Sequence, residues 1–217
     1  TNAIPKPLVP IGDMPILEIV LRQLRYYGVE SVTLAVNHLA RLIQAFFADG
    51  SELDLDIAYS LEDQPLGTAA PLREIDGLPE SFFIMNGDVL TTLDFADLMA
   101  FHREHGNAIT IATFERKVKI DLGVLKVDSG TLADYIEKPE YSFTVSTGIY
   151  ACDRSALKAI PPSGRFDMPQ LVLALKESGE RVGVYAGEFE WLDIGRLDDY
   201  ETAVALFEEK RDEYLPG

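Results

Sequence analysis

Residues 82–90, Phe-Phe-Ile-Met-Asn-Gly-Asp-Val-Leu, constrain the fold more than any other stretch of the chain. The five apolar or near-apolar positions 82–86 predict a strand that is buried on both faces. The run ends at Asn86-Gly87, a pair typical of turns, and Asp88 follows directly. Ligands of open α/β sheets bind outside the carboxyl ends of the strands. Asp88 is therefore either a Mg²⁺ ligand that faces substrate phosphates or a residue that only caps the turn.

Composition narrows the class of protein. The 217 residues are 47% hydrophobic, enough for the core of one large or two small domains. The formal net charge of -17 disfavours nucleic acid and anionic membranes as partners, because both bind basic surfaces. The only cysteine of the sequence is Cys152, so an intrachain disulfide is excluded. Cys152 is expected to be a small residue of the core, and a single free thiol is compatible with a reducing, cytoplasmic compartment. No apolar run approaches the ~20 residues of a membrane helix.

Hydrophobic periodicity predicts that strands and helices alternate in the first half of the chain. The expected helices there are 15–27, 39–48, 67–73 and 94–104, and the expected strands are 31–36, 55–59 and 82–86. Pro15 fits the first position of its helix. The inner face of the second helix is expected to hold Leu42, Ile43, Phe46 and Phe47.

The second half is expected to add antiparallel strands. Strands are predicted at 108–114, 123–127, 132–137, 144–150 and 182–186, and helices at 153–160, 169–176 and 197–210. Ser129-Gly130 predicts a hairpin turn, Asp153 a helix N-cap, and the polar residues 212–217 a frayed tail. The pattern as a whole predicts one α/β domain over 1–217, with a mixed, mostly parallel sheet flanked by helices.

Two loops carry residues suited to a nucleotide. Lys6 lies between two prolines that fix the backbone, so its ammonium group either binds phosphate or stays solvated. Glu62 ends a strand, and its carboxylate suits the two adjacent N–H donors of guanine better than the single ring donor of thymine or uracil. Gly67 permits close approach of a flat base, and the N–H groups from Thr68 onward are expected at a helix N-terminus. The alternative for this loop is a plain helix start.

Further charged residues stand at other strand ends. Glu137 and Lys138 precede Pro139, which favours a bend that lets both side chains serve one ligand; the alternative, favoured for this motif alone, is an exposed strand end. Asp193 lies between Leu192 and Ile194, where a carboxylate is costly unless it is paired, binds a metal or begins a helix. The histidines His102 and His105 have no zinc-like spacing and are expected on a helix surface.

Taken together, these motifs resemble the sugar-phosphate nucleotidylyltransferases over nearly the whole chain. They are Pro5-Lys6-Pro7 through Gly12, Glu62 with Pro65-Leu66-Gly67-Thr68-Ala69, Asn86-Gly87-Asp88, Glu137-Lys138-Pro139, Ser146-Thr147-Gly148-Ile149-Tyr150 and Trp191-Leu192-Asp193-Ile194-Gly195. The likeness is greatest to the mannose-1-phosphate guanylyltransferase-like and glucose-1-phosphate nucleotidylyltransferase-like group. It implies a Rossmann-like fold of the nucleotide-diphospho-sugar transferase type.

The resemblance also implies a reaction and roles for individual residues. A sugar 1-phosphate attacks the α-phosphorus of an NTP, forming an NDP-sugar and pyrophosphate with the help of Mg²⁺. Lys6 resembles the lysine on the NTP phosphates, and Asp88 and Asp193 resemble the metal-binding pair. By the same likeness, Glu62, Gly67 and Thr68 belong to the nucleotide side, and Gly123, Glu137, Lys138 and Gly148 to the sugar-phosphate side. Homo-oligomers are common in the family and are among the expectations.

The sequence departs from the family pattern in two places. The family's glycine-rich loop, with its arginine, is expected before Thr1, together with a first strand. Ser146-Thr147 stands where the family usually has Asn-Ala. GTP with mannose 1-phosphate is the leading substrate pair, because Glu62 suits guanine. The alternatives are glucose 1-phosphate with dTTP or UTP, and a non-catalytic regulatory subunit that binds NDP-sugar.

Overall fold

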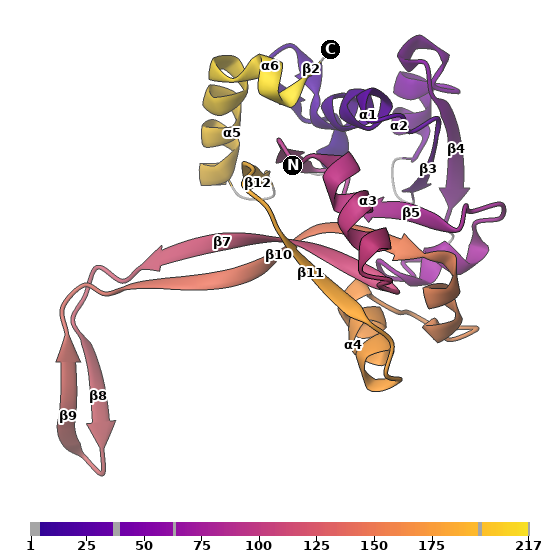
Figure 1. Cartoon of the computed structure of the whole chain (residues 1–217). Coiled ribbons are helices and arrows are strands. Elements are labelled where there is room, and N and C mark those ends of the chain that lie inside the picture. The colour runs from indigo at the N-terminus through magenta and orange to yellow at the C-terminus, as the bar shows by residue number, and fades with distance from the viewer. Residues whose placement is uncertain (1–4, 37–39, 63, 195–196, 217) are drawn as a thin grey trace.

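The computed structural model describes residues 5–36, 40–62, 64–194 and 197–216. Its centre is a four-stranded sheet in the order β11-β7-β10-β5 (Figure 1). The strands are β5 (Ser81–Met85), β7 (Ile109–Lys119), β10 (Glu140–Asp153) and β11 (Val182–Ala186). β10 is antiparallel to both β5 and β7, and β11 is parallel to β7, so three strands run one way and β10 runs the other. The predicted mixed sheet is confirmed, although two of its three strand pairings are antiparallel.

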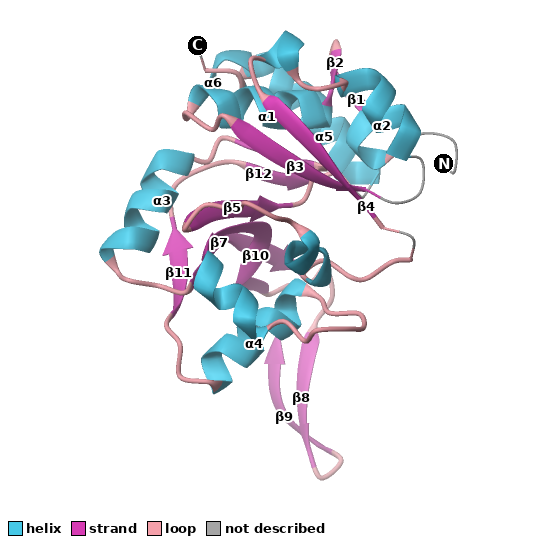
Figure 2. Cartoon of the chain, turned by 90° about the vertical axis from the view of Figure 1, so that its right-hand side faces the viewer, coloured by secondary structure: helices cyan, strands magenta, loops and turns pink. Residues whose placement is uncertain are grey.

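Helices cover both faces of this sheet (Figure 2). α3 (Phe95–Glu104) packs Phe95 and Leu98 into one core, and α4 (Met168–Glu177) packs Leu171 and Leu175 into another. The strand expected at 82–86 joins both cores, because Phe82 packs into the α4 core and Phe83 into the α3 core. Burial of this strand on two faces is thus confirmed.

A parallel pair of strands and its helices lie beside the main sheet. β3 (Ser31–Val36) pairs in register with β4 (Asp56–Leu61), and α2 (Ala40–Phe47) connects them. α1 (Ile16–Tyr26) precedes β3 and buries Ile16, Ile19 and Val20. The short strands β6 (Val89–Thr91) and β12 (Trp191–Asp193) form a separate antiparallel pair.

The remaining elements are short or terminal. They are η1 (Lys6–Leu8), β1 (Pro10–Ile11), β2 (Met14–Pro15), η2 (Ser51–Leu53), η3 (Ala70–Glu74), β8 (Val124–Asp128), β9 (Thr131–Ile136), η4 (Arg154–Ala159), α5 (Leu197–Glu209) and α6 (Arg211–Tyr214). Leu39, Asp63, Gly195 and Arg196, which belong to predicted elements or motifs, lie outside the described residues. No helix of the described residues is both long and apolar enough to span a bilayer.

β7 and β10 are longer than predicted and continue beyond the sheet as a two-stranded ribbon. The ribbon leads into the hairpin of β8 and β9, and together they project from the body (Figure 1). We call residues 115–144 the arm, because Glu115 and Thr144 are the first pair beyond Phe114, whose ring packs against Trp191. The predicted hairpin turn at Ser129-Gly130 is confirmed, and both residues have positive φ.

Several local predictions are wrong. Pro15 is the N-cap of α1 rather than its first helical residue, since it still pairs with Pro10 in β2. Residues 67–73 form no α-helix but lead into the 3₁₀ turn η3. In α2, Ile43 and Phe47 are buried, whereas Leu42 and Phe46 are exposed, because only one side of this short helix packs on the β3–β4 layer.

Two further corrections concern polar residues. His102 is buried rather than on the surface, and it contacts Thr110 and Asp153. Asp153 makes no N-cap hydrogen bond, because its carboxylate is engaged by His102 and Ser81 instead. The tail does not fray throughout: α6 buries the ring of Tyr214.

Cys152 provides a test of the core. Its side chain is fully buried beneath α4, and this burial raises the pKa of the thiol to about 12. Because the thiolate is the reactive form, we expect the native protein to react with an aromatic disulfide at pH 8 at least about 100-fold more slowly than the unfolded chain. One thiol per chain should then appear in denaturant. Rapid reaction of the native protein would contradict this packing.

Candidate functional site

The turn after β5 is held in place by two neighbouring segments. The Asn86 N–H donates to the Gly148 carbonyl of β10 at 3.2 Å. A Cβ at Gly87 would lie 3.6 Å from the Pro7 ring, so the loop of Lys6 packs directly on this turn. β5 therefore delivers Asp88 at its carboxyl end, next to the segment that carries Lys6.

Asp193 reaches the same place from the far end of the sequence. In the antiparallel pair of β6 and β12, Asp193 is the register partner of Val89, the residue after Asp88. β12 is fixed by the Trp191 indole, whose Nε1 donates to the Thr147 carbonyl at 2.9 Å. The structure thus brings together two acidic residues separated by about a hundred positions in the chain.

The pKa of Asp88 is shifted by burial and by its charged neighbours Asp193 and Lys6. Burial raises the pKa of the Asp88 carboxyl, the negative charge of Asp193 raises it further, and the positive charge of Lys6 lowers it. Asp88 and Asp193 are half-buried, whereas Lys6 is exposed. The site therefore concentrates negative charge at a place where water screens it only in part.

This arrangement fits a divalent cation. Mg²⁺ is commonly held by one or two carboxylates, with water and substrate phosphates completing its shell. Among the described residues, no group of three or more His, Cys, Asp or Glu side chains gathers at one point. Asp88 and Asp193 match the open type of Mg²⁺ site rather than a closed all-protein cage.

Glu62, one of the residues predicted to bind the nucleotide, lines a separate pocket of about 370 Å³, whereas Gly67 and Thr68 are not part of its wall. Its walls are Ser60, Leu61, Glu62, Gln64, Leu66, Pro71 and Glu74. One oxygen of the Glu62 carboxylate already accepts the Leu66 N–H at 2.9 Å. The sequence did not predict this bond. The other oxygen of the carboxylate does not bond to Leu66.

The glycine loop beside this pocket is held by its own chain. Gly67 has φ +93°, and a Cβ there would lie 2.6 Å from Asp167 Oδ1, so only glycine fits. The Thr68 N–H donates to the Asp167 carboxylate, and the next two N–H groups donate to the Phe166 carbonyl. The expectation that these groups face a ligand from a helix N-terminus is wrong, because residues 166–167 occupy them.

Gly148, predicted on the sugar side of the site, lies against the turn after β5. It has φ +77° at a bulge of β10, and a Cβ would lie 2.6 Å from Asn86 Nδ2. The departure at Thr147 has a structural reason: its buried hydroxyl donates to the Ala112 carbonyl at 2.8 Å and supports the bulge.

The other predicted sugar-phosphate residues lie on the arm. Gly123 contacts Tyr135, whose hydroxyl donates to Glu137 at 3.0 Å. Lys138 has φ +45°, so the chain bends between β9 and β10, as Pro139 led us to expect. The arm, which carries Gly123, Glu137 and Lys138, projects away from the body that carries Asp88 (Figure 1).

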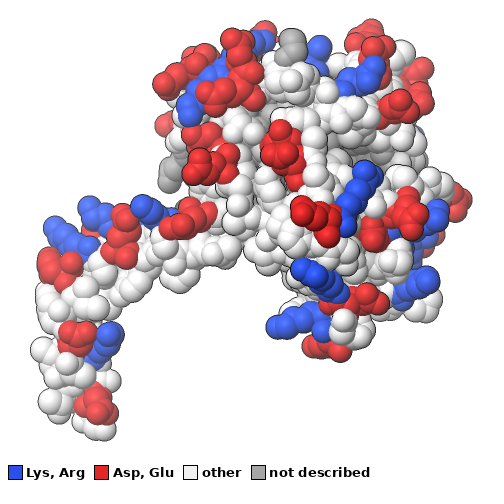
Figure 3. All heavy atoms as spheres, viewed as in Figure 1, with Lys and Arg blue, Asp and Glu red and all other residues white. Residues whose placement is uncertain are grey.

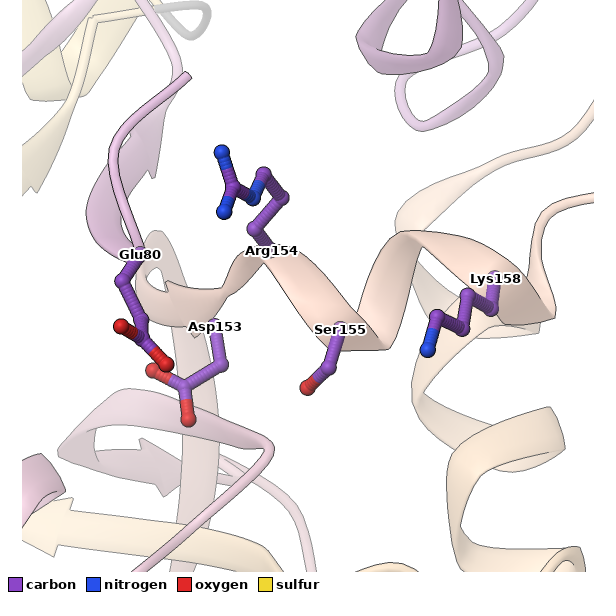
Figure 4. A pocket seen from close by; sticks show the side chains of 5 residues that line it. All are labelled: Glu80, Asp153, Arg154, Ser155 and Lys158. Atoms are coloured by element: carbon purple, nitrogen blue, oxygen red, sulfur yellow. The ribbon is translucent and has the colours of Figure 1, made fainter.

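A second pocket, of about 280 Å³, lies at the opposite end of β5. Glu80, Asp153, Arg154, Ser155 and Lys158 line it, and Figure 4 shows the carboxylates of Glu80 and Asp153 side by side. Behind it, Ser81 and His102 both contact the same oxygen of Asp153, at 2.7 and 3.0 Å. A serine that bonds to the carboxylate rather than to the histidine is not activated, so this network is structural. The burial of His102 could have been predicted from the sequence, because its spacing from Phe95 and Leu98 places all three side chains on the same buried face of α3.

Comparison with known proteins identifies related chains. The model of the family described as nucleotidyl transferase matches residues 1–210. UTP–glucose-1-phosphate uridylyltransferase of Synechocystis is 32% identical, over 100% of this chain and 62% of that protein. Probable mannose-1-phosphate guanylyltransferase 1 of Oryza sativa subsp. japonica is 31% identical, over 95% of this chain and 60% of that protein. The chain thus spans about 60% of the length of these curated relatives.

A solved structure shows the same fold. HddC from Yersinia pseudotuberculosis, complexed with GMP-PN, superposes with a TM-score of 0.72 at 20% identity, covering 94% of this chain and 90% of that chain. The Rossmann-like α/β architecture expected from the sequence is confirmed by this likeness.

The charge on Asp88 should make the fold less stable. The pKa of the Asp88 carboxyl is higher in the folded chain than in the unfolded chain, so the folded chain binds this proton more tightly. The folded state therefore loses stability as the pH rises from 3.8, the ordinary pKa of Asp, through the pKa of Asp88 in the folded chain. We expect Asp88→Asn to raise Tm by a few degrees at pH 7 in metal-free buffer. The gain should vanish below about pH 3.8. Asp76→Asn, at an exposed loop position, is the control; equal Tm changes for both variants would contradict the burial of Asp88.

Proposed function

The chain belongs to the nucleotidyl transferase family, and we propose that it transfers a nucleotidyl group from an NTP to a sugar 1-phosphate, releasing pyrophosphate and forming an NDP-sugar. The observation that carries this proposal is the convergence of Asp88, Asp193 and Lys6 at the carboxyl end of β5. Its relatives include a uridylyltransferase and a probable guanylyltransferase that are named for sugar 1-phosphates. The resemblance to sugar-phosphate nucleotidylyltransferases is thereby confirmed at the level of the family.

The residues of the site suit a reaction that depends on positioning and charge. An oxygen of the sugar phosphate attacks the α-phosphorus, and the bond from that phosphorus to the β-phosphate bridge breaks in line. Lys6 contributes a positive charge from a loop stiffened by Pro5 and Pro7. Asp88 and Asp193 would hold Mg²⁺, which when bound neutralises phosphate charge. Holding both reactants in line removes much of the entropic barrier.

GTP and mannose 1-phosphate are the substrates we propose first. Glu62 offers a carboxylate at a pocket of about 370 Å³, and guanine presents two adjacent N–H donors to such a group. The solved neighbour with bound GMP-PN is in keeping with a guanine nucleotide.

UTP or dTTP with glucose 1-phosphate is the second candidate pair. The bond from Leu66 to Glu62 favours it, since that bond uses part of the accepting capacity that guanine would need. The Synechocystis relative is named for UTP and glucose 1-phosphate. A non-catalytic NDP-sugar-binding subunit is less well supported, because such a subunit has no need of both Asp88 and Asp193.

The activity is tested by pyrophosphate release with Mg²⁺, from the full-length protein supplied with each NTP or dTTP and with mannose or glucose 1-phosphate. We expect release only when a nucleotide and a sugar phosphate are both present. Asp88→Asn and Asp193→Asn should each lower turnover on the order of 100-fold or more, because the phosphates lose a charge-neutralising partner. Asp76→Asn should retain activity. If either site variant kept most of its turnover, the metal assignment would be wrong.

The choice of base is tested by Glu62→Gln. The amide can accept from only one of the two guanine donors, so we expect kcat/KM for GTP relative to UTP to fall roughly tenfold. Glu74→Gln changes another carboxylate of the same pocket and is the matched control. An unchanged ratio in Glu62→Gln would remove the argument for guanine.

A further inference from the structure

Asp193 lies on a pair of strands that has little support of its own. β6 and β12 form a sheet of two strands with three residues each. An isolated pair of strands is at best marginally stable in water. Burial and the negative charge of Asp193 raise the pKa of the Asp88 carboxyl, so the two charged groups repel each other. Contacts from outside the pair must therefore hold Asp193 at the site.

β6 is the fixed strand of the pair. All three of its residues are buried, whereas all three residues of β12 are half-buried. The buried side chain of Gln23 on α1 also donates from Nε2 to the Thr91 carbonyl of β6 at 2.6 Å. A displacement of the two carboxylates from each other therefore moves β12 rather than β6.

Glu190, directly before β12, joins this strand to two other parts of the chain. Its N–H donates to Thr92 Oγ1 at 2.9 Å, and its carbonyl accepts from Thr91 Oγ1 at 2.8 Å and from the Thr92 N–H at 3.1 Å. Its carboxylate accepts from Lys210 Nζ at 2.7 Å. The backbone of Glu190 is thus bound to the residues at the end of β6, and its side chain to the C-terminal helices.

Lys210 reaches Glu190 from a fixed position between α5 and α6. It is the N-cap residue of α6, and its carbonyl accepts the Glu213 N–H at 2.8 Å. The next residue, Arg211, binds both carboxylate oxygens of Asp13, at 2.8 and 3.1 Å. The Arg211 guanidinium also lies 5.1 Å from the centre of the Phe207 ring. A bidentate ion pair of this kind restrains the backbone on which Lys210 stands.

The pairing of Lys210 is selective within an acidic segment. Residues 197–216 contain seven acidic residues and only two basic ones, Lys210 and Arg211. Figure 3 shows acidic and basic side chains close together over α5 and α6. Both basic residues nevertheless pair with acids outside this segment, Glu190 and Asp13. The hydrogen bond to Glu190 raises the pKa of Lys210, so the ion pair persists at neutral pH.

The same helices also hold the other end of β12. Ile194, the residue after Asp193, is buried in one core with Ala203 and Phe207 of α5. Asp193 thus lies between two attachments to the C-terminal helices: the ion pair of Glu190 on one side and the apolar contact of Ile194 on the other.

We propose that Lys210 is a positioning residue of the site, and that through Glu190 it holds β12, and with it Asp193, against the repulsion of Asp88. The inference rests on the proposed function, because Asp193 is one of the two residues proposed to hold Mg²⁺. Lys210 acts only through the position of the strand. A misplacement of about 1 Å can cost on the order of 100-fold in rate, so a contact at the edge of the site has a measurable effect.

The positioning role is tested without activity, by the binding of Mn²⁺ to the full chain, followed by electron paramagnetic resonance. Lys210→Met keeps an unbranched apolar side chain and removes the positive charge. The loss of a positive charge would by itself strengthen the binding of a cation. Loss of positioning should instead weaken Mn²⁺ binding, roughly fivefold for a partly exposed ion pair. Tighter or unchanged binding would overturn the proposal.

The partner residue and a distant ion pair supply the comparisons. Glu190→Gln should also weaken Mn²⁺ binding, and the double variant should bind no more weakly than the weaker single variant, because both changes break one contact. Lys210→Arg keeps the charge and should retain most of the affinity. Arg22→Met breaks the ion pair of Arg22 with Glu18 on α1, at 2.7 Å, and is the matched control. Additive losses, or an equal loss in Arg22→Met, would overturn the proposal.

The position of β12 can also be followed without any ligand. Trp191 is the only tryptophan of the chain and lies in β12. We expect Lys210→Met to raise the acrylamide quenching constant of Trp191, at a temperature at which circular dichroism shows the variant to be folded. An ion pair that only stabilises the fold would lower Tm and leave both the quenching and the Mn²⁺ affinity unchanged, a result that would overturn the positioning role.

The proposed reaction and the positioning role fail in different ways. An inactive wild-type protein in which Lys210→Met still weakens Mn²⁺ binding and exposes Trp191 would refute the reaction and leave the positioning role standing. An active wild-type protein in which Lys210→Met changes neither would refute the positioning role and leave the reaction standing.

Discussion

The position of β10 between β5 and β7 is the constraint on which the rest of the structure depends. One strand of fourteen residues pairs with β5 on one side and with β7 on the other. Its bulge at residues 146–150 lets Gly148 meet Asn86 and gives Trp191 a carbonyl to bind. The same strand, continued outward, becomes half of the arm. The site and the arm are thus two ends of a single element, and an alteration of the bulge would affect both.

The site itself is an electrostatic compromise. Asp88 and Asp193 are held close by backbone register rather than by attraction, and Lys6 offsets only part of their repulsion. A fold that keeps like charges together and half-buried gives up stability. Under the proposed function, a bound Mg²⁺ would supply the missing positive charge, so metal binding and local stability would be coupled.

Much of this site could be predicted from the sequence, since its residues directly follow strands. The apolar run before Asp88 and the apolar neighbours of Asp193 place both carboxylates at strand ends, but the antiparallel pairing of β6 with β12 that brings them together could not be read from the sequence. The hydrogen bond from Leu66 to Glu62 could not be predicted, because it depends on the path of one loop. The burial of His102 was visible only as helical spacing from Phe95 and Leu98, and its polar partners come from distant strands. Alternating polarity predicts the hairpin of the arm, but the direction in which a hairpin leaves the body depends on tertiary contacts.

The tip of the arm has one more consequence. Within the described part of the chain, β8 and β9 pair only with each other, so the outer edge of each strand presents free backbone donors and acceptors beside exposed leucines and valines. Such an edge is a template for indiscriminate strand addition. Lys126 and Asp134, which form an ion pair at 3.1 Å across the hairpin, are the kind of charged residues that resist it. Newly synthesised protein would be prone to aggregation at this hairpin, and its solubility would depend on how quickly the hairpin is covered.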